Sequence, residues 1–107
     1  MNANGCIEEE EFYLWFRMKL LRLYIKRDYM YLSKKICQYL PPSTAKTLLR
    51  CSRKEWNVTL TGVVRRRLVN MWKQFVVDNK LKKWSVLLFE LVKATSSAVI
   101  FVVEVQG

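Results

Sequence analysis

Residues 64–75 read VRRRLVNMWKQF, and this stretch decides the fold that the sequence predicts. Its apolar residues follow the spacing i, i+4, i+7, i+8, i+11 of one helix face, and they are Val64, Leu68, Met71, Trp72 and Phe75. The basic residues lie mostly off that stripe, and they are Arg65, Arg66, Arg67 and Lys73. The pattern therefore predicts an amphipathic helix that buries one face and presents bases on the other.

Apolar stripes of similar spacing predict further helices over about residues 9–26, 28–39, 43–51 and 80–94. The helix over 28–39 ends before Pro41, because a residue that precedes proline is disfavoured in the helical conformation. Residues 52–60 are interpreted as a polar loop. Residues 98–105 are β-branched and aromatic, so a strand and a short buried helix both remain open for them.

We therefore expect an all-α fold, a bundle of five to six helices with a β-prone C-terminal tail. The chain is divided into a flexible arm (1–8), a helical bundle (9–95) and an apolar tail (96–107). In such a bundle Trp72, Phe75, Trp84 and Leu88 are expected to be mostly buried.

The charge balance points to an acidic partner. The chain carries 19 Lys and Arg against 9 Asp and Glu, a net charge of +10. Nucleic acid, an anionic membrane and an acidic protein face all fit a field of this sign. The candidate partner-binding residues are Arg17, Arg22, Lys26, Trp56, Arg65, Arg66, Arg67 and Lys73. Trp56 is included because it stands in the polar loop, where we expect it to be exposed.

Several function classes are disfavoured by the residues that the sequence lacks. The chain has no histidine, no Walker loop and no GxGxxG motif, so we expect no enzyme activity and no cofactor. The three cysteines form no close pair, which disfavours a metal site and predicts free thiols, with Cys37 and Cys51 buried. Reduced thiols fit a cytoplasmic protein, and the longest apolar run, 98–103, is too short to cross a membrane.

The order of these features resembles the caspase-recruitment domains of the death-fold superfamily, most of all those of RIG-I-like RNA sensors and their mitochondrial adaptor. The similarity covers roughly residues 10–94 and rests on the following segments: FYLWF at 12–16, ICQYLP at 36–41, LVNMW at 68–72, and Lys83-Trp84. It implies an adaptor in innate-immune or apoptotic signalling. The partner would be a death-fold protein with an acidic face, or further copies of the chain.

Two other hypotheses stay open beside the adaptor. The first is a small basic helical protein, viral or regulatory, that binds the phosphates of nucleic acid through the same arginines. The second is association of the basic first helix with an anionic membrane surface.

Overall fold

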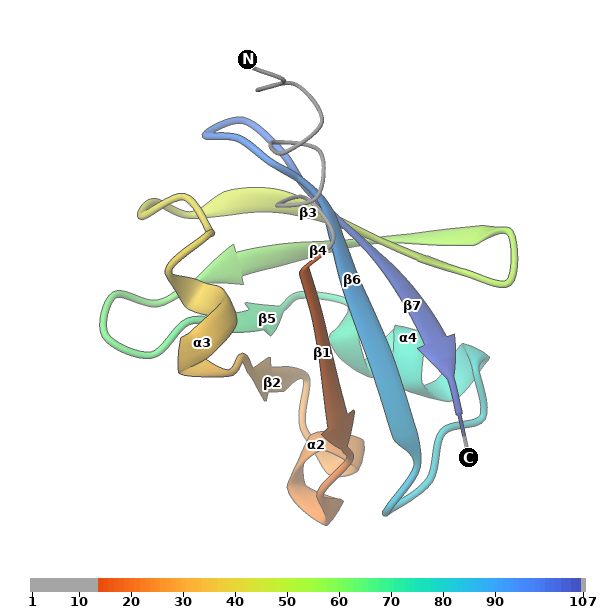
Figure 1. The fold of residues 1–107 in the computed structure, drawn as a ribbon. Coiled ribbons are helices and arrows are strands. Elements are labelled where there is room, and N and C mark those ends of the chain that lie inside the picture. The colour runs from red at the N-terminus through yellow and green to blue at the C-terminus, as the bar shows by residue number, and fades with distance from the viewer. Residues whose placement is uncertain (1–13, 107) are drawn as a thin grey trace.

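The computed structural model describes residues 14–106, which fold around one strongly curled sheet (Figure 1). Its seven strands follow the order β1-β6-β7-β3-β4-β5-β2, and only β3 and β7 are parallel neighbours. The strands are β1 (Leu14–Lys19), β2 (Tyr29–Tyr31), β3 (Ala45–Cys51), β4 (Lys54–Thr61), β5 (Arg67–Val69), β6 (Val86–Ala94) and β7 (Val99–Val105). Three short helices join them, and these are α2 (Arg22–Lys26), α3 (Lys34–Cys37) and α4 (Trp72–Asp78).

Alternation of apolar and polar residues places one face of each long strand in the core. In β4 the side chains of Trp56, Val58 and Leu60 are buried, and the residues between them point outward. Neighbouring strands contribute fully buried aromatic rings to the core. Phe89 of β6 meets Phe101 of β7 edge to face, with ring centroids 5.6 Å apart.

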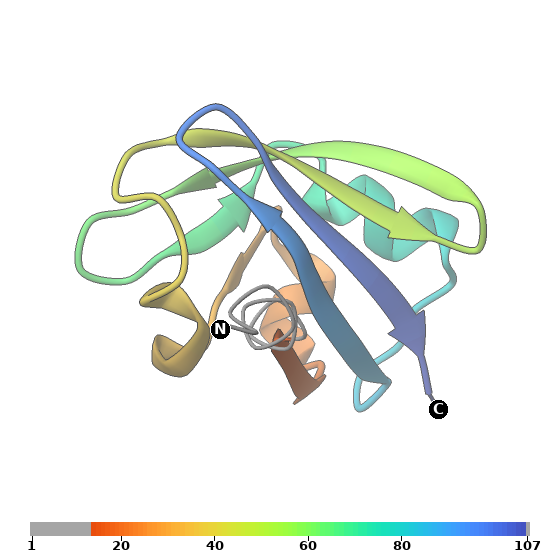
Figure 2. The same ribbon diagram turned by 45° about the horizontal axis from the view of Figure 1, so that its top comes forward.

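Helix α4 packs inside the curl of the sheet, next to α2 (Figure 2). Its Trp72 is fully buried, and the indole N–H donates to the carbonyl of Tyr24 in α2 at 2.9 Å. The carboxylate of Asp28 accepts from the backbone N–H of Lys73 at 2.7 Å and so caps the start of α4. These bonds fix the segment between β1 and β2 against α4. Within residues 14–106 no helix is long and apolar enough to span a membrane.

The all-α prediction is wrong, and the helical bundle of residues 9–95 with it. The stripe in residues 64–75 arises from two elements, because Leu68 enters the core from β5 whereas Trp72 and Phe75 enter it from α4. Val64, on the same predicted stripe, is 87% exposed. The caspase-recruitment resemblance is wrong for the same reason: spacings that fit one continuous helix belong to a strand, a turn and a short helix.

The predicted tail is a central part of the sheet. Strand β7 pairs with β6 on one side and with β3 on the other, and Val99 and Phe101 are fully buried. The predicted burial of Trp72 and Phe75 is confirmed, whereas Trp84 is 53% exposed and Leu88 only half-buried. Cys37 and Cys51 are free thiols, with Cys51 buried and Cys37 half-buried. The predicted arm, 1–8, lies outside the described residues.

Candidate nucleic-acid interface

In the part of the chain that the structure describes, the excess of basic over acidic residues is larger than in the whole chain. All 19 Lys and Arg lie in residues 14–106, against five Asp and Glu. Three of these acids are held locally: Asp28 caps α4, Glu55 pairs with Arg50 at 3.0 Å, and Asp78 accepts from the indole N–H of Trp56 at 2.8 Å. The field around the folded chain is therefore strongly positive.

The outward residues of β4, β5 and β2 form one continuous surface, here named the β4–β5–β2 face. Two rows cross it. One consists of Thr59, Val69 and Tyr29, and the other of Thr61, Arg67 and Tyr31. The row between them, Leu60, Leu68 and Met30, is fully buried, so the strands are anchored from below. Lys46 of β3 extends the first row, because it lies opposite Thr59.

Two basic segments flank this face. Residues 20–28 lead directly into β2, and Arg22, Lys26 and Arg27 are exposed there. Residues 62–66 lead directly into β5 and carry Arg65 and Arg66. Between positions 57 and 70 the chain has no acid, and between positions 20 and 34 its one acid is Asp28, which is bound to α4. The face and its flanks thus carry positive charge with little to neutralise it.

Arg66 holds the loop 62–66 in place. Its side chain is 6% exposed, and the guanidinium donates to the carbonyls of Pro41 at 2.7 Å, Ser43 at 2.7 Å, Pro42 at 3.3 Å, and Gly62. The carbonyl of Arg66 accepts from the backbone N–H of Leu32 at 2.9 Å. One arginine therefore ties the loop to the turn before β3 and to the end of β2.

The rest of the loop is presented to solvent. Val63 and Val64 are 93% and 87% exposed, which is unusual for aliphatic side chains in a well-anchored loop. The guanidinium carbon of Arg65 lies 4.1 Å from the ring centroid of Tyr31, so the arginine is held over the β4–β5–β2 face by a cation–π contact. The side chains available to a ligand here are two valines and an oriented arginine.

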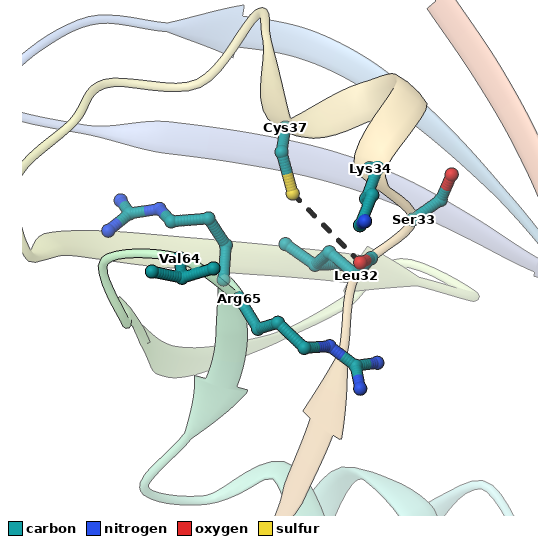
Figure 3. A pocket seen from close by; sticks show the side chains of 7 residues that line it. Leu32, Ser33, Lys34, Cys37, Val64 and Arg65 are labelled. Carbon is teal, nitrogen blue, oxygen red and sulfur yellow. Dashed lines mark hydrogen bonds between the residues drawn. The ribbon is translucent and has the colours of Figure 1, made fainter.

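A hollow of about 420 Å³ lies between this loop and α3, lined by Leu32, Ser33, Lys34, Cys37, Val64, Arg65 and Arg66 (Figure 3). The thiol of Cys37 faces the carbonyl of Leu32 at 3.9 Å. Burial raises the pKa of this thiol, so it is protonated at neutral pH. We assign the hollow no chemistry of its own.

No family model and no curated protein matches the chain. Solved structures do match it, among them the following three, which cover most of its length. A hypothetical Arabidopsis thaliana protein has a TM-score of 0.66 at 17% identity, covering 84% of this chain and 88% of that one.

The second structure is the Arabidopsis FUS3–DNA complex, with a TM-score of 0.65, 16% identity, and 86% and 95% of the two chains covered. The third is the N-terminal domain of Helicobacter pylori LlaJI.R1, with a TM-score of 0.63, 15% identity, and 86% of each chain covered. The three share the curled β-sheet fold of this chain. At these identities the likeness establishes the fold, which is not a death fold.

The structure divides the predicted binding residues. It brings Arg65 and Arg67 to the β4–β5–β2 face and places Arg22 and Lys26 on the flanking segment. Lys73 lies in the first turn of α4, beside the cap formed by Asp28. Arg17 lies on β1, where its Nε donates to Gln106 at 3.2 Å. That any of these residues contacts a partner stays a prediction.

Two of the predicted binding residues, Trp56 and Arg66, are buried and contact other parts of the fold. The expected exposure of Trp56 is wrong, because its side chain is 9% exposed, bound to Asp78 and packed edge to face on Phe75. Arg66 is buried among backbone carbonyls. Tyr29 and Tyr31 were not predicted as site residues, because residues 28–39 were expected to be helical. Thr59 was not predicted, because residues 52–60 were taken for a loop. The alternation in residues 54–61, KEWNVTLT, is the signal that predicts a strand there.

Proposed function

We propose that this protein binds double-stranded DNA through the β4–β5–β2 face and its two flanking segments. The observation that carries the proposal is the placement of charge. Arg65 and Arg67 lie on or beside one outward surface, and Arg22, Lys26 and Arg27 lie on the segment that enters it. The two acids in these elements are already engaged, Asp28 with the start of α4 and Glu55 with Arg50. Such a surface attracts the phosphates of a duplex and releases their counterions.

The chemistry of the face suits contacts to bases as well as to phosphates. An arginine forms two parallel hydrogen bonds to O6 and N7 of a guanine in the major groove, and apolar side chains contact the methyl group of thymine. Arg65 is oriented by Tyr31, and the exposed Val63 and Val64 project beside it. The side chains of loop 62–66 therefore suit contacts to the edges of nucleobases, whereas the basic residues of segment 20–28 suit contacts to the phosphate backbone of the DNA.

The FUS3 structure supports the proposal, because that protein of the same fold was solved in complex with DNA, and 95% of its chain is covered by the match. A role in binding nucleic acid also agrees with the hypothesis, drawn from the sequence, of a small basic protein that binds the phosphates of nucleic acid. The expectations of a non-enzymatic role and of a cytoplasmic location stay predictions.

Fluorescence anisotropy with labelled duplex DNA at several salt concentrations tests the proposal. Arg65→Ala and Arg67→Ala should each weaken binding by about 5- to 100-fold if the arginine contacts a nucleobase. If it contacts a phosphate, the loss should be smaller, and the slope of the logarithm of the binding constant against the logarithm of the salt concentration should become shallower by about one. Lys93→Ala on β6 removes the same charge from an exposed position away from the face, and serves as the matched control.

Two results contradict the proposal. One is equal affinity of the Lys93→Ala and Arg67→Ala variants for duplex DNA, which would mean that only total charge matters. The other is wild-type binding to duplex RNA as tight as to duplex DNA, since the major groove of RNA is too narrow to admit the loop 62–66.

A further inference from the structure

Residues 80–84, between α4 and β6, form a second basic surface that includes an aromatic ring. Leu81 of this segment is buried, and the remaining side chains, Lys80, Lys82, Lys83 and Trp84, are all exposed. The segment thus carries three exposed lysines and one exposed tryptophan, and it contains no acid. The indole of Trp84 is 53% exposed, in a fold that buries Trp56 and Trp72.

The backbone holds Trp84 in a conformation that its side chain disfavours. Its φ is +75°, in the left-handed region that a bulky residue rarely occupies. Its N–H donates to the carbonyl of Leu20 at 2.8 Å, and the N–H of Leu20 donates to the carbonyl of Ser85 at 2.8 Å. Two hydrogen bonds therefore fix the backbone of Trp84 against the start of segment 20–28. An exposed aromatic residue kept in a strained position suggests a functional role.

Two ammonium groups lie against the indole. The Nζ atoms of Lys83 and Lys19 are 4.9 and 5.9 Å from the ring centroid. Both lysines are exposed, and within residues 14–106 neither donates to a carboxylate. They can therefore leave the ring for an anion without breaking an ion pair in that part of the chain.

We propose that Trp84, Lys19 and Lys83 form a binding site for single-stranded nucleic acid. The indole would stack on one unpaired base while the two lysines bind the phosphates on either side of it. The base must be unpaired because, in a duplex, the faces of the bases are covered by their neighbours. Stacking of this kind tolerates any base and pairs naturally with flanking positive charge. The site adjoins the start of segment 20–28 but shares no residue with the duplex-binding face or its flanks, and it holds whether or not that face binds DNA.

A membrane surface suits this site less well than nucleic acid does. Stable insertion into a bilayer needs an apolar area of some size, whereas one indole is the whole of the exposed apolar surface in residues 80–84. Weak attraction to anionic lipid through the three lysines is therefore treated as an outcome of the test.

The test measures the anisotropy of a labelled oligothymidylate with the full chain. Trp84→Ala should weaken binding by about 5- to 100-fold, the effect of losing one base–aromatic stack, and Trp84→Phe should retain most of the affinity. The matched control is Trp15→Ala, because Trp15 is also 53% exposed but lies opposite Glu90 on the neighbouring strand. Replacing Lys19 and Lys83 by Gln should make the salt dependence of binding shallower.

Three results would overturn this site. They are wild-type protein that does not bind the oligothymidylate, equal losses in the Trp84→Ala and Trp15→Ala variants, and Trp84-dependent binding to phosphatidylserine vesicles without oligonucleotide binding. Duplex binding by the Arg65→Ala and Arg67→Ala variants is measured in parallel, so failure of the single-strand site is distinguished from failure of the duplex face. Thermal unfolding of each variant shows that the fold is intact.

Discussion

Gly62 sets the direction of the loop that precedes β5. Its φ is +103°, and a Cβ placed there would lie 2.1 Å from the carbonyl oxygen of Arg65. Gly62→Ala should therefore lower the free energy of unfolding by at least about 1–2 kcal/mol, the cost of the left-handed conformation alone. Urea unfolding followed by tryptophan fluorescence measures the change. Val64→Ala, in the same loop but exposed, should unfold like the wild type, and equal stability of the two variants would contradict this account.

Arg66 acts on the loop as a positioning residue. Replacing it with Met leaves the carbonyls of Pro41, Ser43 and Gly62 without their donor, so we expect a loss of about 2–4 kcal/mol in the free energy of unfolding. Arg65→Met removes the same charge from an exposed position and should change stability little. If the two variants lost equal stability, the buried network would not be what holds the loop.

Helix α4 is attached to β4 by a bond that depends on pH. Hydrogen bonds from Trp56 and Gln74, together with the charge of Lys54, hold the pKa of Asp78 below its ordinary value of 3.8. A carboxylate with a depressed pKa stabilises the fold fully above its unfolded pKa, and this contribution is lost as the pH falls through the folded pKa.

Unfolding measured between neutral pH and strongly acidic pH should show this loss in the wild type. In Asp78→Asn the difference in stability from the wild type should be largest at neutral pH and should shrink as the pH falls below 3.8. A difference that stays constant across this range would mean that the Trp56–Asp78 bond does not depend on the carboxylate charge.

At the scale of the elements, the sequence predicts which residues of segment 64–75 are buried, but it does not predict that they belong to a strand and a helix rather than to one helix. Leu68, Trp72 and Phe75 are fully buried, as the stripe predicts. A strand ends at Val69 and a helix begins at Trp72, with Asn70 and Met71 at positive φ between them. Two periods therefore meet within a few residues, and the combined spacing is the same as that of one long helix.

The pairing of distant strands explains what could not be predicted at the site. Arg65 and Arg67 were chosen from the sequence for their charge, and the structure places them beside Tyr31. Tyr29 and Tyr31 join that face only because β2 pairs with β5, some forty positions along the chain. No local pattern carries that information. Trp56 was misplaced because residues 52–60 were taken for a loop, although their alternation is that of a strand.

At the scale of the whole molecule, the sheet separates two kinds of surface. Strands β6 and β7 supply two fully buried rings, Phe89 and Phe101, and their outward residues include Glu90 and Glu104. The one acid among the outward residues of the β4–β5–β2 face is Glu55, and it is paired with Arg50. Because the two surfaces differ in charge in this way, we expect one binding surface even though basic residues are spread along the whole chain.

Whether duplex DNA binds the β4–β5–β2 face is best measured by amide chemical-shift mapping of the isotope-labelled protein during titration with duplex DNA. The largest shifts should fall in residues 22–31 and 57–70, which contain the β4–β5–β2 face and its flanks. Smaller shifts are expected over residues 87–105, since β6 and β7 lie away from that face. Shifts concentrated in residues 87–105, or no shifts at DNA concentrations that saturate other basic domains, would contradict it.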